Sequence, residues 1–188
     1  MDALVAAFVA GLLLQAGDRI PWFTAILADR LRSTTGVLIA SVLAIPAGYG
    51  VAAVAGQVLA QHMSPNASAL FLAFMLISAG GAGLVTLKPP NRFESGKGGG
   101  FVLGLIGVLS LLLGDRTQFL VVALAARSPT PAFAAVGATL GTLAVVTVAT
   151  LAGEAARKGL PIQVFRIATG VASILIGLIV AVNALRLT

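Results

Sequence analysis

Long apolar segments and short polar breaks alternate along the whole chain. The apolar segments span residues 3–28, 33–60, 67–87, 101–126, 132–153 and 162–185. Each contains the roughly 20 apolar residues that a helix needs to cross the hydrocarbon core of a bilayer. Proline, glycine or charged residues stand between the segments. The pattern predicts an all-α polytopic membrane protein with six transmembrane helices.

Two of these segments carry a charged pair near their middle. Asp115 and Arg116 interrupt the fourth segment, and Asp18 and Arg19 interrupt the first segment 97 positions earlier; each pair follows a glycine. A charged side chain at the centre of a membrane helix costs roughly 2.5–3.5 kcal/mol. These residues must therefore be offset by packing, by pairing or by a function, and they are the first candidates for a functional site.

The separation of the two motifs is close to half the length of the chain, which indicates an internal repeat. We expect a first three-helix repeat at residues 1–88, a cytoplasmic linker at 89–100 and a second three-helix repeat at 101–188. Because each repeat contains three helices, the first and fourth spans run in opposite directions, and the repeats have inverted topology. In the first span, Gly17 and Pro21 predict a kinked or broken helix beside Asp18.

Composition narrows the class of protein. Hydrophobic residues make up 59% of the chain and charged residues 10%, whereas a soluble domain carries about 25% charged residues, so the water-soluble classes are excluded. The absence of cysteine removes disulfides, thiolate metal sites and cysteine nucleophiles. The single histidine stands in a connection, without a Ser-His or Cys-His set. Nothing in the sequence therefore supports an enzyme, and we expect no cofactor.

The net charge of +6 does not indicate nucleic acid, because the basic residues stand in short connections between apolar segments. With six spans, the termini and the second and fourth connections share one face of the membrane, which holds Arg127 and Arg186. The opposite face holds eight basic residues: Arg30, Arg32, Lys88, Arg92, Lys97, Arg157, Lys158 and Arg166. The positive-inside rule then puts both termini outside, and we expect a bacterial-type inner membrane.

The two motifs supply the oxygen atoms that a hard cation such as Ca²⁺ or Mn²⁺ prefers. The candidate metal ligands are Asp18, Asp115, Gln15, Thr117 and Gln118, with Arg19 and Arg116 as charge-balancing residues. Both carboxylates stand about 15 residues into their spans, roughly 22 Å along a helix, so they can meet near the membrane midplane. Either aspartate is also able to exchange a proton. The alternative is that the Asp and Arg side chains form buried ion pairs that only fix helix packing.

These residues resemble the motifs of a known transporter family, uncharacterised protein family 0016, the transmembrane protein 165 group of Mn²⁺/Ca²⁺:H⁺ antiporters. The similarity covers the whole chain in layout. It is strongest from Leu111 to Leu185, where GDRTQFLVVALAARSPTPAFAAVGATLG looks like the second repeat of the family and its following helix. The resemblance implies six spans in two inverted repeats, each carrying Glu-x-Gly-Asp-Lys/Arg-Thr/Ser, and exchange of Mn²⁺ or Ca²⁺ for protons.

The motifs of this chain depart from the family pattern at both glutamate positions. Gln15 and Leu112 stand where the family has Glu, and Ile20 stands where it has Thr or Ser. In the family, four acidic groups face two basic ones, whereas here two acidic groups face two basic ones and the motif charges sum to zero. By this resemblance, the chain is identified as a divergent member that lacks both motif glutamates.

The leading interpretation is a secondary active cation/proton antiporter with its substrate site at the midplane between the two Gly-Asp-Arg motifs. Its partners are then the lipid bilayer, the transported cation and protons, with no nucleic acid. Homodimerisation stays open, because no specific interface is evident.

Two alternatives to this function remain. One is an exporter of another small solute on the same architecture, since an Asp/Arg site suits both ends of an amino-acid-like substrate. The other is a degenerate membrane protein that transports nothing.

Overall fold

The computed structural model describes residues 2–86, 99–159 and 161–186, apart from the side chains of 156–158 and 186. These residues form helices joined by short turns, with no strand among them. The helices are α1 (Asp2–Gln15), α2 (Arg19–Leu31), α3 (Thr34–Ala60), α4 (Pro65–Leu84), α5 (Gly100–Leu112), α6 (Arg116–Arg127), α7 (Pro131–Lys158) and α8 (Ile162–Arg186). The all-helical architecture predicted from the apolar pattern is confirmed. The expected linker at 89–100 lies outside the described residues up to position 98.

Four of the described helices are long and apolar enough to cross a membrane by themselves, namely α3, α4, α7 and α8. α1 and α2 pass the same test only together, as do α5 and α6, and the members of the two pairs meet at bends of 59° and 60°. The described chain therefore contains four candidate spans, or six if each bent pair is one span. The two bends fall at the two Gly-Asp-Arg motifs.

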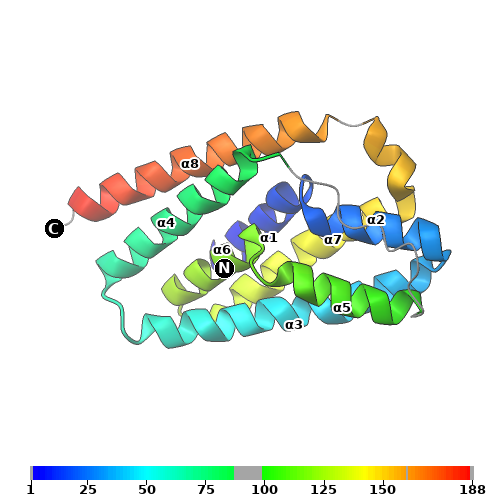
Figure 1. Ribbon diagram of the computed structural model, residues 1–188. Coiled ribbons are helices and arrows are strands. Elements are labelled where there is room, and N and C mark those ends of the chain that lie inside the picture. The colour runs from blue at the N-terminus through cyan, green and yellow to red at the C-terminus, as the bar shows by residue number, and fades with distance from the viewer. Residues whose placement is uncertain (1, 87–98, 160, 187–188) are drawn as a thin grey trace.

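Two long helices, α3 and α7, contact most of the other helices and are here called the central helices (Figure 1). α3 and α7 pack against each other, the bent pair α1–α2 lies along α7, and the bent pair α5–α6 lies along α3. α4 and α8 run side by side as an outer pair. This outer pair contacts the rest of the described bundle chiefly where α4 meets α6, and α8 hardly contacts α2. The two bends are therefore held mainly by the central helices.

Glycines set the distance between α1 and α7. A Cβ at Gly141 would fall 2.3 Å from the carbonyl oxygen of Phe8, and one at Gly137 would fall 2.1 Å from that of Leu4. Because no side chain fits at such distances, glycine at these two positions, one turn apart, lets the two backbones touch. The contact fixes α1 on α7 and so positions the end of α1 that carries Gln15.

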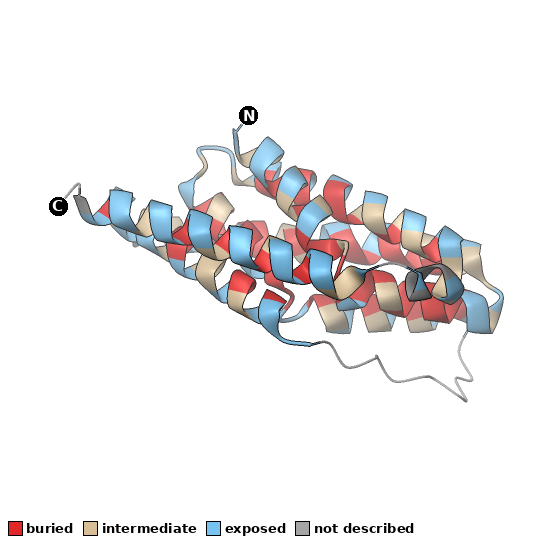
Figure 2. Ribbon diagram, turned by 90° about the horizontal axis from the view of Figure 1, so that it is seen from above, coloured by how far each residue is buried: buried red, intermediate tan, exposed pale blue. Residues whose placement is uncertain are grey.

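Burial follows the packing of the helices (Figure 2). Buried residues lie on the faces that helices turn toward one another, and exposed residues lie on the outer faces. Many exposed positions are large and apolar, such as Val51 of α3 and Ile179 of α8, as a lipid environment allows. The charged residues that are buried in the described structure are Asp18, Asp115, Arg116 and Arg166. They all lie at the two bends or in contact with them.

Candidate functional site

The bend between α1 and α2 is a tight turn closed by the first motif aspartate. The backbone N–H of Asp18 donates to the carbonyl oxygen of Gln15 at 3.0 Å, and the Asp18 carboxylate then caps α2 by accepting the N–H of Arg19 at 2.8 Å. A carboxylate at this position faces the positive end of the helix dipole. Pro21 lies in the first turn of α2, where a missing N–H costs nothing. The predicted break in the first span is confirmed.

The bend between α5 and α6 repeats this turn at the second motif. The backbone N–H of Asp115 donates to the carbonyl oxygen of Leu112 at 3.0 Å, and its carboxylate caps α6 by accepting the N–H of Thr117 at 3.1 Å. Gly114 has a φ of 87°, a conformation that costs a residue with a Cβ roughly 1–2 kcal/mol. A break at this motif was not predicted from the sequence, in which no proline follows Gly114.

Asp18 pairs with an arginine of the other motif rather than with its own neighbour. Arg116 Nε donates to Asp18 Oδ2 at 2.7 Å, and Arg116 Nη2 donates to the carbonyl oxygen of Leu14 at 2.7 Å. Arg166 of α8 approaches Asp18 Oδ1 with Nη1 at 3.4 Å. The exposed fractions are 6% for Asp18, 6% for Arg116 and 4% for Arg166. Each of these buried charges therefore depends on the others for its stabilisation.

Asp115 is surrounded by uncharged polar groups instead. Gln15 Nε2 donates to Asp115 Oδ2 at 2.7 Å and to Thr117 Oγ1 at 3.2 Å. The same Nε2 lies 3.4 Å from the hydroxyl of Tyr49 on α3, and this hydroxyl bonds to Thr142 Oγ1 on α7 at 3.0 Å. The four neighbours are fully buried. A buried polar network thus joins α1, α3, α6 and α7 around one carboxylate.

Both aspartates line one polar cavity of about 350 Å³. Its wall is formed by the two bends, the end of α4 and the beginning of α8. The charged residues that line it are Asp18, Arg19, Asp115, Arg116 and Arg166. Two carboxylates and three guanidinium groups give this cavity a formal charge of +1. The structure thus adds one positive charge to the neutral set expected from the motifs.

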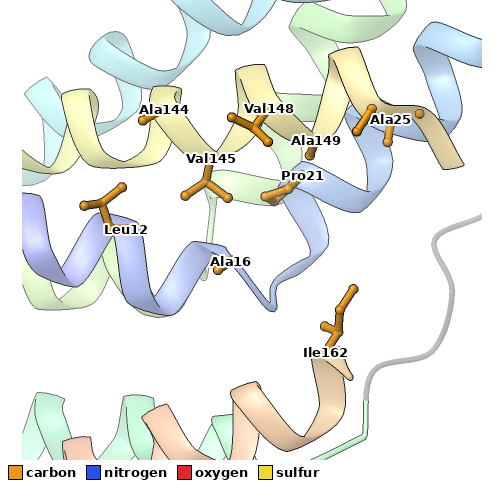
Figure 3. Close-up of a pocket in the computed structure, with 11 residues that line it drawn as sticks. Leu12, Ala16, Pro21, Ala25, Ala144, Val145, Val148, Ala149 and Ile162 are labelled. Atoms are coloured by element: carbon orange, nitrogen blue, oxygen red, sulfur yellow. The ribbon is translucent and has the colours of Figure 1, made fainter. Parts of the chain in front are cut away.

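A second hollow beside the first bend is apolar (Figure 3). It has a volume of about 390 Å³ and lies between α1, α2, α7 and the first residue of α8. Its wall includes Ala16 of the turn after α1, Pro21 of α2, Val148 of α7 and Ile162 of α8. None of the side chains that line it carries a polar atom, so it offers a cation no side-chain ligand. We therefore place the candidate site in the polar cavity.

The structure brings most of the predicted site residues together, and the side chains of two others take no part in their hydrogen bonds. Gln15, Asp18, Asp115, Arg116 and Thr117 share the contacts described above. Gln118 instead directs Nε2 toward the carbonyl oxygen of Gly48 on α3 at 3.4 Å. Arg19 is exposed, and its side chain lines the cavity without an ion pair among the described residues. Of the two arginines expected to balance the carboxylates, Arg116 contacts Asp18, and Arg166 joins it there in place of Arg19.

Arg166 is a site residue that the two motifs do not indicate. The expectation that it belongs to a cytoplasmic connection is wrong, because it lies inside α8 and is buried against Asp18. Its position within the sixth apolar segment is the sequence feature that could have indicated its burial. Without it, the count of basic residues becomes seven against two, which leaves the expected orientation unchanged. Five of the seven lie outside the described residues or have undescribed side chains: Lys88, Arg92, Lys97, Arg157 and Lys158.

The chemistry of the cavity combines carboxylates with neutral oxygens. The described residues contain no group of three or more Asp, Glu, His or Cys side chains that would hold a metal ion. A hard cation bound here would rest on two carboxylates, supplemented by amide, hydroxyl and backbone carbonyl oxygens. Gln15 Oε1 is buried without a hydrogen-bond partner in the described structure, so one such oxygen is available beside Asp115.

Comparisons with known proteins point to ion transport. Residues 100–187 match a protein family described as "Divalent cation/proton antiporter GDT1". A protein of Vibrio cholerae named "Putative manganese exporter" is 26% identical over 167 residues, which cover 88% of this chain and 84% of the relative. No solved structure matches this chain. The family match covers the second motif and the helices α5 to α8 that contain and follow it.

Proposed function

We propose that this chain is a secondary active transporter that exchanges a divalent cation, Mn²⁺ or Ca²⁺, for protons. The observation that carries the proposal is that Asp18 and Asp115, each at the break of a bent apolar helix pair, line the same polar cavity. Broken helices that present carboxylates and unpaired backbone groups at matching places in two halves are typical of transporter sites. The family match and the manganese-exporter relative support the same function.

The proposed architecture has six spans, in which each bent pair counts as one span. The two halves then form inverted repeats of three spans each, with α1–α2 corresponding to α5–α6, α3 to α7 and α4 to α8. The packing supports this correspondence, because α1–α2 lies along α7 as α5–α6 lies along α3. We further propose a bacterial inner membrane with both termini outside. Reporter fusions at the C-terminus test the orientation, and an active cytoplasmic reporter would overturn it.

In the proposed mechanism, Asp18 and Asp115 bind the cation in one step and protons in the other. Gln15 and Thr117 supply neutral oxygens next to Asp115, and Arg116 balances Asp18 when no cation is bound. Because one site cannot hold both a divalent cation and the protons on the same carboxylates, binding of one releases the other. Rocking of the two halves around the fixed site would give access from alternate faces of the membrane.

Uptake of Mn²⁺ and of Ca²⁺ into proteoliposomes, with and without a pH gradient, tests the proposal. We expect uptake that the pH gradient accelerates and that Asp115→Asn abolishes, whereas Asp2→Asn, at the exposed start of α1, leaves it unchanged. The variant Gln15→Glu with Leu112→Glu restores both carboxylates of the family motif. Uptake by this variant and not by the natural chain would mean that the natural chain moves another solute or none.

A second candidate function has one specific observation in its favour. The cavity presents three guanidinium groups beside two carboxylates, and Arg19 is exposed in it. Such a mixture complements a zwitterionic, amino-acid-like solute, whose carboxylate would bind arginine and whose ammonium group would bind aspartate. Metal-independent counterflow of labelled amino acids through proteoliposomes, absent in Arg19→Gln, would replace cation exchange by this function.

A further inference from the structure

Arg166 occupies a position that no described function explains. Its guanidinium group donates to the carbonyl oxygens of Ala82 and Gly83 in the last turn of α4, and to the carbonyl oxygen of Gly17 at 3.2 Å. The same Nη1 that contacts Gly17 also lies 3.4 Å from Asp18 Oδ1. One side chain of α8 therefore connects the end of α4 to the bend between α1 and α2.

The bend between α1 and α2 packs closely against the side chain of Arg166. Gly17 has no positive φ among the described backbone angles, but a Cβ at this position would fall 3.1 Å from the Cβ of Arg166. A side chain at the glycine of the first motif would thus crowd Arg166, whereas Gly114 of the second motif is favoured by its φ of 87°. The equivalent position in the first half, 97 residues before Arg166, is Ala69. An arginine of the outer helix pair α4–α8 therefore stands at the corresponding position for only one of the two bends, the bend between α1 and α2.

The charges of the cavity conflict with the binding of a divalent cation while Arg166 is present. The formal charge of +1 would become +3, and like charges at close range in a partly buried cavity repel strongly. Arg116 is held by two bonds of 2.7 Å, whereas Arg166 reaches Asp18 at 3.4 Å. Arg166 also keeps its two bonds to α4 if the α4–α8 pair moves as a unit. Of the two arginines that contact Asp18, Arg166 is therefore the one that can leave the bend more easily.

The two oxygens that Arg166 Nη1 contacts at the bend are ligands that a hard cation prefers. Asp18 Oδ1 is a carboxylate oxygen, and Gly17 supplies a backbone carbonyl oxygen. Building on the proposed function, we propose that Arg166 is an internal competitor of the transported cation: its guanidinium group occupies the cation position between Gly17 and Asp18, and withdraws with α8 when the cation binds. It is a positioning residue that sets the affinity of the site and links its occupancy to the position of the α4–α8 pair.

The affinity for Mn²⁺ tests the proposal directly. Trp22, the single tryptophan of the chain, lies in α2 near the bend, and its fluorescence reports Mn²⁺ binding to the purified protein independently of transport. We expect Arg166→Gln to lower the half-saturating Mn²⁺ concentration by about tenfold or more, because a unit positive charge next to the cation is removed. Its maximal transport rate falls, since nothing replaces the cation when it leaves. Arg127→Gln, at the exposed end of α6, is the matched control and leaves both values unchanged.

A second measurement uses the natural chain and does not depend on a folded variant. Phenylglyoxal modifies accessible arginine side chains, and peptide mass spectrometry locates the modified residues. We expect modification of Arg166 to increase when saturating Mn²⁺ is added, while exposed Arg127 reacts equally in both conditions. Unchanged protection of Arg166 at saturating Mn²⁺ would overturn the proposal.

The outcomes separate this inference from the proposed function. If the natural chain transports Mn²⁺ and Arg166→Gln has unchanged or weaker affinity, Arg166 is only a structural residue and the inference is overturned. If the natural chain transports no cation but Arg166→Gln binds Mn²⁺, the competitor role stands and the proposed function falls. If neither protein binds Mn²⁺ or Ca²⁺, both are overturned.

Discussion

Asp18 and Asp115 belong to matching motifs but have different partners. Asp18 is paired with two arginines, whereas Asp115 accepts hydrogen bonds from the Gln15 amide and the Thr117 backbone. Removal of one member of a buried ion pair leaves an uncompensated charge, which costs about 3–5 kcal/mol. Replacement of a carboxylate by an amide of the same shape among neutral partners costs less, because a carbonyl oxygen still accepts those bonds.

The two aspartates are therefore expected to respond differently to the same substitution. Asp18→Asn should lower the free energy of unfolding by several kcal/mol and abolish transport, whereas Asp115→Asn should abolish transport with little loss of stability. Thermal unfolding in detergent and flux in proteoliposomes measure the two effects. Equal loss of stability in both variants would contradict the difference in their partners, and normal flux in either would remove that aspartate from the site.

The Tyr49 hydroxyl links the site to the central helices. It bonds to Thr142 Oγ1 at 3.0 Å and lies 3.4 Å from Gln15 Nε2, with all three residues fully buried. Tyr49→Phe removes this bridge and should raise the half-saturating cation concentration, because the amide of Gln15 loses one of the contacts that orient it. Thr142→Val removes the other partner of the hydrogen bond between Tyr49 and Thr142. In a double-mutant cycle the two effects should not add; additive effects would show that the hydroxyl does not position Gln15.

At the scale of single elements, the two bends have similar sequences, but their glycines differ in backbone conformation. Gly114 adopts a positive φ in open space, so Gly114→Ala should destabilise the protein by roughly 1–2 kcal/mol through backbone strain alone. Gly81 in α4 also faces open space but has helical geometry, so Gly81→Ala should be neutral or stabilising by up to about 1 kcal/mol. Thermal unfolding of the two variants checks the contrast. Equal midpoints would contradict a strained turn at position 114.

The elements were predictable wherever an apolar run was bounded by strong breakers. α8 begins at Ile162, as its apolar segment predicts, and the first bend was predicted from Gly17 and Pro21. The second bend was not predicted, because no proline follows Gly114 as Pro21 follows Gly17, and only the tertiary structure shows the φ of Gly114. Arg166 was missed because pairing across the fold, between residues 148 positions apart, leaves no local pattern.

At the scale of the whole molecule, the outer helix pair is attached asymmetrically. α4 packs against α6, whereas α8 hardly contacts α2. In the proposed inverted repeat these two contacts are equivalent. A structure that makes one of them and not the other then represents one of two related states, and the second state would bring α8 onto α2 while α4 leaves α6.

The apolar hollow between α2 and α8 is the space that this movement would close. Ala25 of α2 and Ile162 of α8 both line it. The chain contains no cysteine, so a disulfide between two introduced cysteines is detected without interference from native cysteines. We expect Ala25→Cys with Ile162→Cys to form a disulfide under oxidant in a fraction of molecules that decreases when Mn²⁺ is added, because the proposed withdrawal of Arg166 carries α8 away from the first bend.

The contact between α4 and α8 supplies the matched control for this experiment. A Cβ at Gly177 would lie 2.8 Å from Ile77 Cγ1, so Ile77→Cys with Gly177→Cys should cross-link equally with and without Mn²⁺, because both residues belong to the pair that moves as a unit. Non-reducing electrophoresis measures both reactions. If the Ala25 and Ile162 pair never cross-links, α8 does not reach α2, and the asymmetry of the outer pair is a fixed property of the fold rather than one position of a moving element.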